Sequence, residues 1–395
     1  MSRPRAREFG VRFPGAPGAL NAITDVAGVE VGHVTLIRGD SIRTGVTVVW
    51  PRGRDDSAPV FAGHFALNGN GEMTGTAWIA ESGSLDGPIL LTNTHSVGTV
   101  RDAYIRWMVQ TGRLPATNVT QSGAFWALPV VAETFDGRLN DINGFHVGND
   151  HVAECLEAAR SGPVPEGAVG AGTGSICYGF KGGIGTASRM IAGPFTLGVL
   201  VQANCGLKHQ LLISGCPIGR ELARDVSSAP TRDGLETGSI IVVLATDAPL
   251  LPHQATRLAK RAAMGLARTG SSAGNGSGDL FVAFSTTPIG RGHDAVESVL
   301  MMRNEALSPL FEAAVEATEE AIINALFAAE TMIGLNKNRA DALPLEDVRL
   351  LLERHGHDDP SGRLKSSADP NNHFSSESVF RPPGLDDLSS TPTQK

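Results

Sequence analysis

The sequence predicts a globular fold in which β-strands and α-helices are mixed. Short segments that are rich in β-branched residues and bounded by glycine, such as 29–37 and 239–245, are typical of strands. A segment with apolar residues at helical spacing, 308–331, predicts a long amphipathic helix. The chain has 395 residues, 41% hydrophobic and 19% charged, so it can form one large domain or two.

Seven segments are expected to be extended, because their apolar runs are short and β-branched. In one of them Pro129 would break a helix. The seven are 29–37, 45–50, 89–94, 126–132, 195–204, 239–245 and 280–285.

Four segments carry apolar residues at helical spacing. The third has Leu258, Ala262 and Leu266 on its inner side and a basic outer side, and Gly270 fits its C-terminal stop. Asn149 is expected to cap the second. The four are 96–110, 150–159, 252–268 and 308–331.

Composition excludes several classes of protein. The net charge of −8 argues against a nucleic-acid-binding protein. No run of about 18 apolar residues is present, so no membrane-spanning helix is expected. The charged N-terminus lacks the apolar core of a signal peptide, which predicts a cytoplasmic protein. The four cysteines form no CxxC pair and have no zinc-like spacing, so we expect buried free thiols.

The last forty residues differ in character from the rest. From about residue 355 the periodicity is lost and Asp, Pro, Ser and Asn dominate. We therefore expect residues 356–395 to be a disordered tail and residues 1–355 to form the folded domain.

The most informative segment runs from Ala267 to Asp279 and contains two Gly–Ser junctions, Gly270–Ser271 and Gly276–Ser277. A serine hydroxyl can attack the carbonyl that precedes it, and glycine tolerates the distorted geometry of that attack. If the bond breaks, the serine becomes a chain terminus that carries both a nucleophile and an amine. The alternative is a flexible Gly/Ser connector.

Other polar residues carry two interpretations each. Asn204 ends an apolar strand and can form a turn or present its amide to a developing oxyanion. Glu133 can be a surface carboxylate or an acceptor for a substrate ammonium group. Thr318 can be a core threonine bonded to a backbone carbonyl or a hydroxyl aimed at a site. Glu319 and Glu320 fit a solvated acidic helix face or a catalytic pair. The segment Gly170–Gly174 is a glycine turn more than a dinucleotide fingerprint, since GxGxG is not GxGxxG.

Several ordered segments together resemble the DmpA-type L-aminopeptidase/D-esterase and β-peptidyl aminopeptidase family. The resemblance covers residues 10–355, and the combination of segments is specific although each one alone is not. The segments are 18–32, Leu91-Thr-Asn-Thr-His-Ser-Val-Gly98, Pro129-Val-Val-Ala-Glu-Thr-Phe-Asp-Gly137, 139–144, Val201-Gln-Ala-Asn204, 245–254, Asn275-Gly-Ser-Gly-Asp279 and Ala317-Thr-Glu-Glu-Ala321.

This resemblance implies an α+β fold, an αββα four-layer sandwich that processes itself into an α chain of residues 1–276 and a β chain of residues 277–395. It implies a homotetramer of processed units that removes N-terminal residues from short peptides, amides or esters. It implies no metal and no organic cofactor.

Residue by residue, the resemblance makes Ser277 the nucleophile and Gly276–Ser277 the cut, with Gly270–Ser271 as the competing junction. Asn204 matches the oxyanion asparagine, and Glu133 matches the acidic residue that holds the substrate amine. Thr318 and Glu320 match the hydroxyl–carboxylate relay, although a serine is more familiar than Thr318. Phe135 stands in the substrate-binding region where a tyrosine is expected, so a hydroxyl contact is missing.

Two other functions are compatible with the sequence. An acyltransferase would use the same self-cleaved nucleophile but transfer the acyl group to an amine. A non-catalytic nucleotide- or metabolite-binding protein would use the Gly/Ser segment only as a linker.

Overall fold

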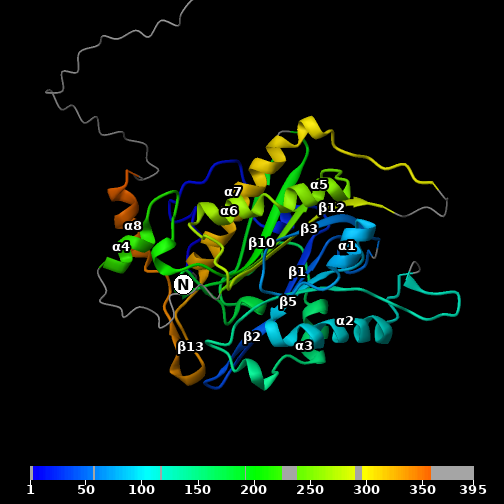
Figure 1. Ribbon diagram of the computed structural model, residues 1–395, viewed down its shortest axis with the longest axis horizontal. Helices are drawn as coiled ribbons and strands as arrows, with labels where there is room; N and C mark the ends of the chain where they lie inside the picture. Colours follow the sequence, from blue (N-terminus) through cyan, green and yellow to red (C-terminus); the bar gives the residue numbers. More distant parts are fainter. Residues whose placement is uncertain are drawn as a thin grey trace, which may run out of the picture. The chain divides into compact units, whose positions relative to one another are not determined.

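Two β-sheets form the centre of the computed structural model (Figure 1). The first has the strand order β1 (Glu30–Arg38), β2 (Ile42–Trp50), β5 (Ile89–Asn93), β6 (Val130–Thr134). The second has the order β4 (Ser84–Leu85), β3 (Val60–Gly69), β12 (Gly278–Pro288), β11 (Ser239–Thr246), β10 (Thr196–Asn204), β9 (Gly183–Met190). Two short hairpins are β7 (Ile176–Cys177) with β8 (Phe180–Lys181), and β13 (Met332–Ile333) with β14 (Arg339–Ala340).

The structure describes residues 3–56, 58–115, 118–191, 193–224, 238–289 and 296–356. Except for Gly356, the expected tail lies outside these residues. The helices are α1 (Thr76–Ser82), α2 (Val97–Thr111), α3 (Asn149–Glu157), α4 (Ile218–Arg224), α5 (Pro252–Ala259), α6 (Ala262–Arg268), α7 (Ser308–Ala328) and α8 (Leu345–Arg354).

Three hydrophobic clusters separate four layers. The middle cluster joins apolar side chains of both sheets, for example Val49 and Leu91 from the first and Leu200 and Val243 from the second. A second cluster packs α2 and α3 on the outer face of the first sheet. The third packs α5, α6 and α7 on the outer face of the second sheet. In Figure 1 these two helical layers lie on opposite sides of the sheets. The prediction of an αββα sandwich is therefore confirmed.

The strands that the sequence predicted are present, with boundaries moved by a few residues. The predicted strand at 126–132 begins only at Val130, and β3 and β9 were not predicted. Because β3 contains Gly63, His64, Asn68 and Gly69, and β9 begins Gly-Ile-Gly, neither shows a continuous β-branched run.

Two helix predictions need correction. The predicted helix 252–268 is broken at Lys260 and Arg261 into α5 and α6, although its inner residues are buried as expected. Asn149 is the first residue of α3, and the N-cap position belongs to Gly148. The imidazole of His151 accepts from the Gly148 N–H at 3.0 Å, which satisfies that end of the helix instead.

The four cysteines are buried and unbridged, as predicted. Within the described ranges, no helix combines the length and the apolar character that crossing a bilayer requires.

Gly185 allows α7 to lie directly on β9. A Cβ atom at Gly185 would lie 1.9 Å from the carbonyl oxygen of Ala321, which belongs to the helix backbone and cannot rotate away. We expect Gly185→Ala to force the helix off the sheet and to lower the free energy of unfolding by about 3 kcal/mol. Urea unfolding measures this. The control is Gly98→Ala in α2, where a Cβ meets nothing within 4 Å, and no loss is expected there. Equal stability of the two variants would contradict the close contact.

Candidate active site

Ser277 lies immediately before β12 and is fully buried in the uncut chain. Its hydroxyl donates to Asp279 Oδ1 at 2.7 Å. Its backbone N–H donates to the carbonyl of Gly274 at 2.9 Å and closes a turn over residues 274–277. The nucleophile predicted from the sequence is therefore held at the start of a strand, in a tight turn.

Two asparagines at the end of β3 hold the segment that precedes Ser277. The amide of Asn68 donates to the carbonyls of Ala273, at 3.1 Å, and Gly274, at 2.6 Å. The amide of Asn70 donates to the carbonyl of Gly276 at 2.8 Å. The carbonyl of the predicted scissile bond thus has a side-chain donor.

Asn204 lies in the same row as Gly278, the residue after the nucleophile, because the ends of three strands are aligned. Asn204 pairs with Ser239 across β10 and β11, and Ser239 pairs with Gly278 across β11 and β12. The Ser239 hydroxyl accepts from the Gly278 N–H at 3.1 Å. The Asn204 amide nitrogen donates to the carbonyl of Phe135 at 2.9 Å, and its oxygen accepts from Ile176 N–H at 2.7 Å. These two bonds fix the orientation of the amide.

A buried lysine supports the turn that orients Asn204. The ammonium group of Lys181 donates to the carbonyls of Ser175, at 2.7 Å, Gly182, at 2.8 Å, and Gly172, at 3.2 Å. Burial lowers the pKa of Lys181 to about 7. Ile176, the donor to Asn204, lies between these carbonyls in the chain, so Lys181 secures its position.

Glu133, in β6, is 2% exposed, and only Gly71 separates it from Gly278, the residue after the nucleophile. Its carboxylate accepts from the hydroxyl of Thr94 and from the N–H of Glu72, the latter at 3.0 Å. A Cβ at Gly71 would lie 3.1 Å from Glu133 Oε1 and 3.3 Å from Gly278 Cα, so only this glycine separates them. Burial raises the pKa of Glu133, and the hydrogen bonds from Thr94 and Glu72 oppose that rise.

Phe135 contributes its backbone to the site, because its carbonyl holds Asn204. Its side chain is 45% exposed. A cavity of about 200 Å³ lies beside the same edge and is lined by Gly71, Met73, Leu280 and residues of β3. The site therefore combines a nucleophile, an amide, a buried carboxylate and an adjacent apolar cavity.

Thr318 and Glu320 have other partners than Ser277 in the uncut chain. The Thr318 hydroxyl donates to the carbonyl of Ala314 at 2.7 Å, one turn back in α7, as expected for a core threonine. The relay through this pair remains a prediction, since the described hydrogen bonds of neither residue reach the nucleophile.

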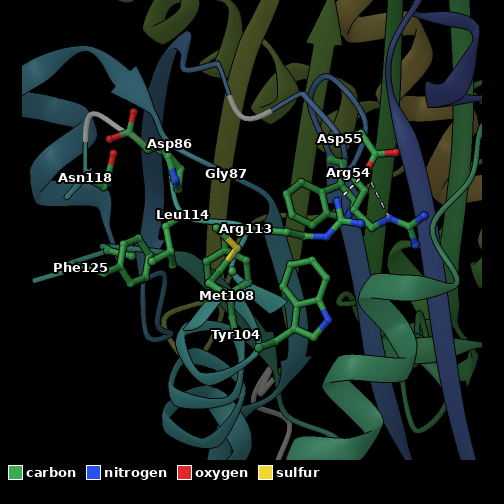
Figure 2. Close-up of a pocket in the computed structure, with 15 residues that line it drawn as sticks. Arg54, Asp55, Asp86, Gly87, Tyr104, Met108, Arg113, Leu114, Asn118 and Phe125 are labelled. Carbon is green, nitrogen blue, oxygen red and sulfur yellow. Dashed lines mark hydrogen bonds and ion pairs between the residues drawn. The ribbon is translucent and has the colours of Figure 1, made fainter. Parts of the chain in front are cut away.

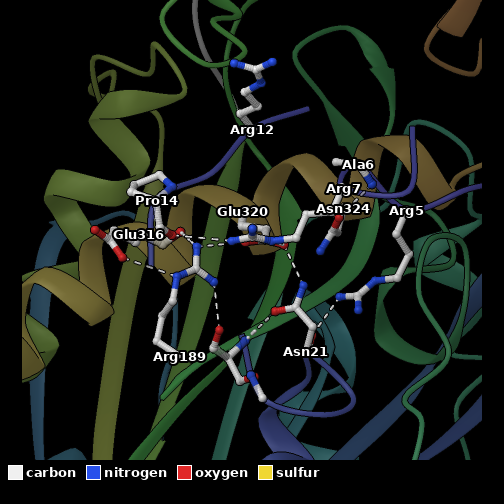
Figure 3. Close-up of polar contacts among 12 residues, drawn as sticks. Arg5, Ala6, Arg7, Arg12, Pro14, Asn21, Arg189, Glu316, Glu320 and Asn324 are labelled. Carbon is white, nitrogen blue, oxygen red and sulfur yellow. Dashed lines mark hydrogen bonds and ion pairs between the residues drawn. The ribbon is translucent and has the colours of Figure 1, made fainter. Parts of the chain in front are cut away.

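Glu320 is fully buried, which corrects the alternative of a solvated acidic face. It pairs with Arg7, at 2.7 Å, and with Arg189, at 2.8 Å, and it accepts from Asn21 at 2.6 Å (Figure 3). Glu319 is also buried and pairs with Arg268 at 3.3 Å. The Glu320 carboxylate thus ties the N-terminal segment and β9 to α7.

The competing junction has a structural explanation. Gly270 has φ of +99°, and a Cβ there would lie 1.9 Å from the carbonyl oxygen of Gln210. The left-handed backbone that ends α6 and the close approach of Gln210 therefore require a glycine here, without any cleavage chemistry at this junction. The Ser271 hydroxyl accepts only a local bond among those described, from Ala273 N–H at 3.1 Å. This favours Ser277 as the nucleophile.

A second cavity, of about 220 Å³, lies at the C-terminal end of α2 and is separate from this site (Figure 2). Trp50, Tyr104 and Trp107 line it. Among its charged lining residues, Asp55 pairs with both Arg113 and Arg54. No predicted site residue lines it, so chemistry and not cavity size identifies the active site.

Asp279, Asn70 and Ser239, which lie next to the nucleophile, are among the residues of this arrangement that were not predicted to have a role. Asp279 belongs to the motif Asn275-Gly-Ser-Gly-Asp279. Its carboxylate stands two residues after the serine, and this spacing is the sequence feature that could have indicated a contact with the hydroxyl. Asn70 and Ser239 are distant from the serine in sequence. Strand pairing brings Ser239 to Gly278, and the crossing of the chain after β3 over Gly278 brings Asn70 to Gly276.

The mixed sheets between helical layers, with a serine at the start of a central strand, define a hydrolase of the N-terminal-nucleophile type. The model described as Peptidase family S58 matches residues 21–340. The chain therefore belongs to peptidase family S58, and it is a serine aminopeptidase.

Individual relatives agree with the family. β-Peptidyl aminopeptidase BapA from Sphingosinicella microcystinivorans is 51% identical over 375 residues, which cover 89% of this chain and 92% of the relative. The solved L-aminopeptidase D-Ala-esterase/amidase from Ochrobactrum anthropi, described as a variant of the Ntn hydrolase fold, has a TM-score of 0.83 and 45% identity. The match covers 90% of this chain and 99% of the chain of that solved structure. A β-aminopeptidase from Burkholderia sp. has a TM-score of 0.81 and 47% identity, over 89% and 99% of the two chains. The predicted family, fold and hydrolase class are confirmed over the acyltransferase and binding-protein alternatives.

The contacts of Glu320 predict that it is needed for stability. Glu320→Gln would remove the buried, shorter ion pair of the Arg189 guanidinium and leave it only the longer pair with Glu316, so we expect a loss of about 3 kcal/mol in the free energy of unfolding. The control is Glu316→Gln, because Glu316 is partly exposed and lies 3.3 Å from the same arginine; we expect less than about 1 kcal/mol there. Urea unfolding compares the two. Unchanged stability with a large fall in kcat for Glu320→Gln would support the relay instead.

Proposed function

We propose that this chain cuts its own Gly276–Ser277 bond and then acts as an aminopeptidase on short peptides, amides or esters. The observation that carries this proposal is the convergence of Ser277, Asn204 and Glu133 at one sheet edge, from three strands and two sheets. In the uncut chain Ser277 is buried, so the cut has to precede turnover.

After the cut, Ser277 carries a free amine beside its hydroxyl. The amine takes the hydroxyl proton, and Oγ attacks the first carbonyl of the substrate. A hydrogen of the Asn204 amide stabilises the oxyanion, an effect worth about 3 kcal/mol for one donor. The leaving amine receives the proton, and water then hydrolyses the acyl-serine. A relay from Glu320 through Thr318 is the alternative proton acceptor, which the stability comparison above tests.

Glu133 anchors the ammonium group of the substrate. Its carboxylate is buried and lies next to the backbone of Gly278, so a bound ammonium lies one residue length from the nucleophile. This restricts cleavage to the first residue of the substrate. The adjacent cavity of about 200 Å³ has room for an apolar side chain of that residue.

The names of the relatives indicate a range of substrate classes. They cover β-peptides, L-amino acid peptides and D-alanyl esters or amides. We propose that this enzyme takes substrates from the same range, in the processed homotetramer that the family resemblance implies. Four buried free thiols fit a reducing compartment such as the cytoplasm.

Replacing Ser277 with alanine is expected to abolish both chain splitting and turnover, because both reactions need the same hydroxyl. Intact mass under denaturing conditions measures splitting. In the wild type we expect two fragments that sum to the full chain, the smaller one beginning at Ser277. The control Ser271→Ala should split normally. A Ser277→Ala chain that still splits would refute the assignment.

The anchor role of Glu133 predicts a pH dependence of KM. Burial raises the pKa of its carboxyl above 4.5. As the pH falls through this raised pKa, the carboxyl becomes neutral and loses its attraction for the ammonium, so KM for free-amine substrates should rise. Glu133→Gln is neutral at every pH and should show about a 10- to 100-fold higher KM without that acid limb. N-blocked esters provide the control, and an equal loss on them would exclude the anchor.

A further inference from the structure

We propose that the self-cleavage step uses two catalytic side chains of its own: Asn70 as the donor to the oxyanion and Asp279 as the base for the Ser277 hydroxyl. The proposal rests on the proposed cut at Gly276–Ser277 and assigns the groups that perform it. Each residue already contacts one of the two reacting groups, the scissile carbonyl and the attacking hydroxyl.

Asn70 is placed by the crossing of two backbones. A Cβ at Gly278 would lie 2.4 Å from the carbonyl oxygen of Asn70 and 2.9 Å from Gly71 Cα, so the chain after β3 passes directly over Gly278. This crossing brings the Asn70 amide to 2.8 Å from the Gly276 carbonyl oxygen. When the hydroxyl attacks, negative charge develops on that oxygen, and the amide is already bonded to it.

The terminal amine that we propose as the base of the mature enzyme does not exist before the cut. The nitrogen of Ser277 is then part of the scissile amide, and its N–H is bonded to Gly274. An amide nitrogen is not a base, so another group has to accept the hydroxyl proton. Asp279 Oδ1 accepts this hydroxyl at 2.7 Å, and both residues are fully buried.

The reaction then balances with water alone. Asp279 takes the proton from Ser277 Oγ, which bonds to the carbonyl carbon of Gly276 and forms an oxyanion on its oxygen. The C–N bond breaks as the nitrogen receives the proton from Asp279, leaving an ester between Gly276 and Ser277. Water hydrolyses the ester, which gives the carboxylate of Gly276 and the free hydroxyl and amine of Ser277.

The assignment separates self-cleavage from turnover. The scissile carbonyl belongs to the chain that precedes Ser277 and meets Asn70, on the β3 side of β12. Asn204 belongs to β10, on the other side, beyond β11. The two amides therefore serve acyl groups on opposite sides of the nucleophile.

The test follows chain splitting after cell-free synthesis of the full-length protein, with samples quenched in denaturant and weighed by mass spectrometry. Asn70→Ala and the nearly isosteric Asn70→Asp should slow splitting by about 100-fold, the lower end of the range for one oxyanion donor, since Asn70 is exposed. Asp279→Asn should slow it by at least about 100-fold.

The matched control is Asn68→Ala, which removes bonds to the same loop but none to the scissile carbonyl. We expect a less than 10-fold effect there. Urea unfolding of each uncut variant, compared with uncut Ser277→Ala, shows whether the fold is kept. Equal slowing by Asn68→Ala and Asn70→Ala would overturn the oxyanion role, and wild-type splitting of Asp279→Asn would overturn the base.

The position of the cut is determined in a separate measurement, from the masses of the two wild-type fragments. A small fragment that begins at Ser277, together with variants that split at the wild-type rate, would overturn this inference and leave the proposed function intact. A fragment that begins at Ser271 would overturn both.

Discussion

The hydrogen-bond register of β10, β11 and β12 is the constraint on which the active site depends. It places Asn204, Ser239 and Gly278 in one row, so the Asn204 amide and the nucleophile next to Gly278 lie at the same end of the sheet although Asn204 and Ser277 are 73 positions apart in the sequence. A slip of one residue would turn these side chains to the other face of the sheet. Every residue of β10 and β11 is buried, one face against the first sheet and the other against helices, so such a slip would remove two hydrophobic cores from their packing.

The same constraint explains how far the sequence alone could go. The apolar strands and long helices were predictable because continuous burial leaves a continuous apolar pattern, as in 195–204 and 239–245. Glu133, Asn204 and Ser277 were candidates because each polar residue stands at the end or start of such a strand. Their convergence could not be derived from spacing, because it depends on sheet order and on the stacking of two sheets.

Residues whose role depends on contact between distant segments escaped prediction. Asn70 follows a strand whose glycines conceal its pattern, and its position beside Gly276 follows from a backbone crossing. The opposite error concerns Glu320, which has the spacing of an exposed acidic face. It is buried because Arg7 and Arg189 approach it from the N-terminal segment and from β9. Ion pairs between remote segments leave no periodic signal in a helix.

Burial of Ser277 gives the two chemical events their order. In the uncut chain Ser277 is fully buried, and the nitrogen that would serve as base is an amide bonded to Gly274. The chain therefore has neither access for a substrate nor the terminal amine until the bond is broken. A single cleavage creates the amine and ends the chain segment that precedes Ser277, so we expect it to supply both. The buried carboxylate of Asp279 is the group next to the hydroxyl during the only stage at which that amine is absent.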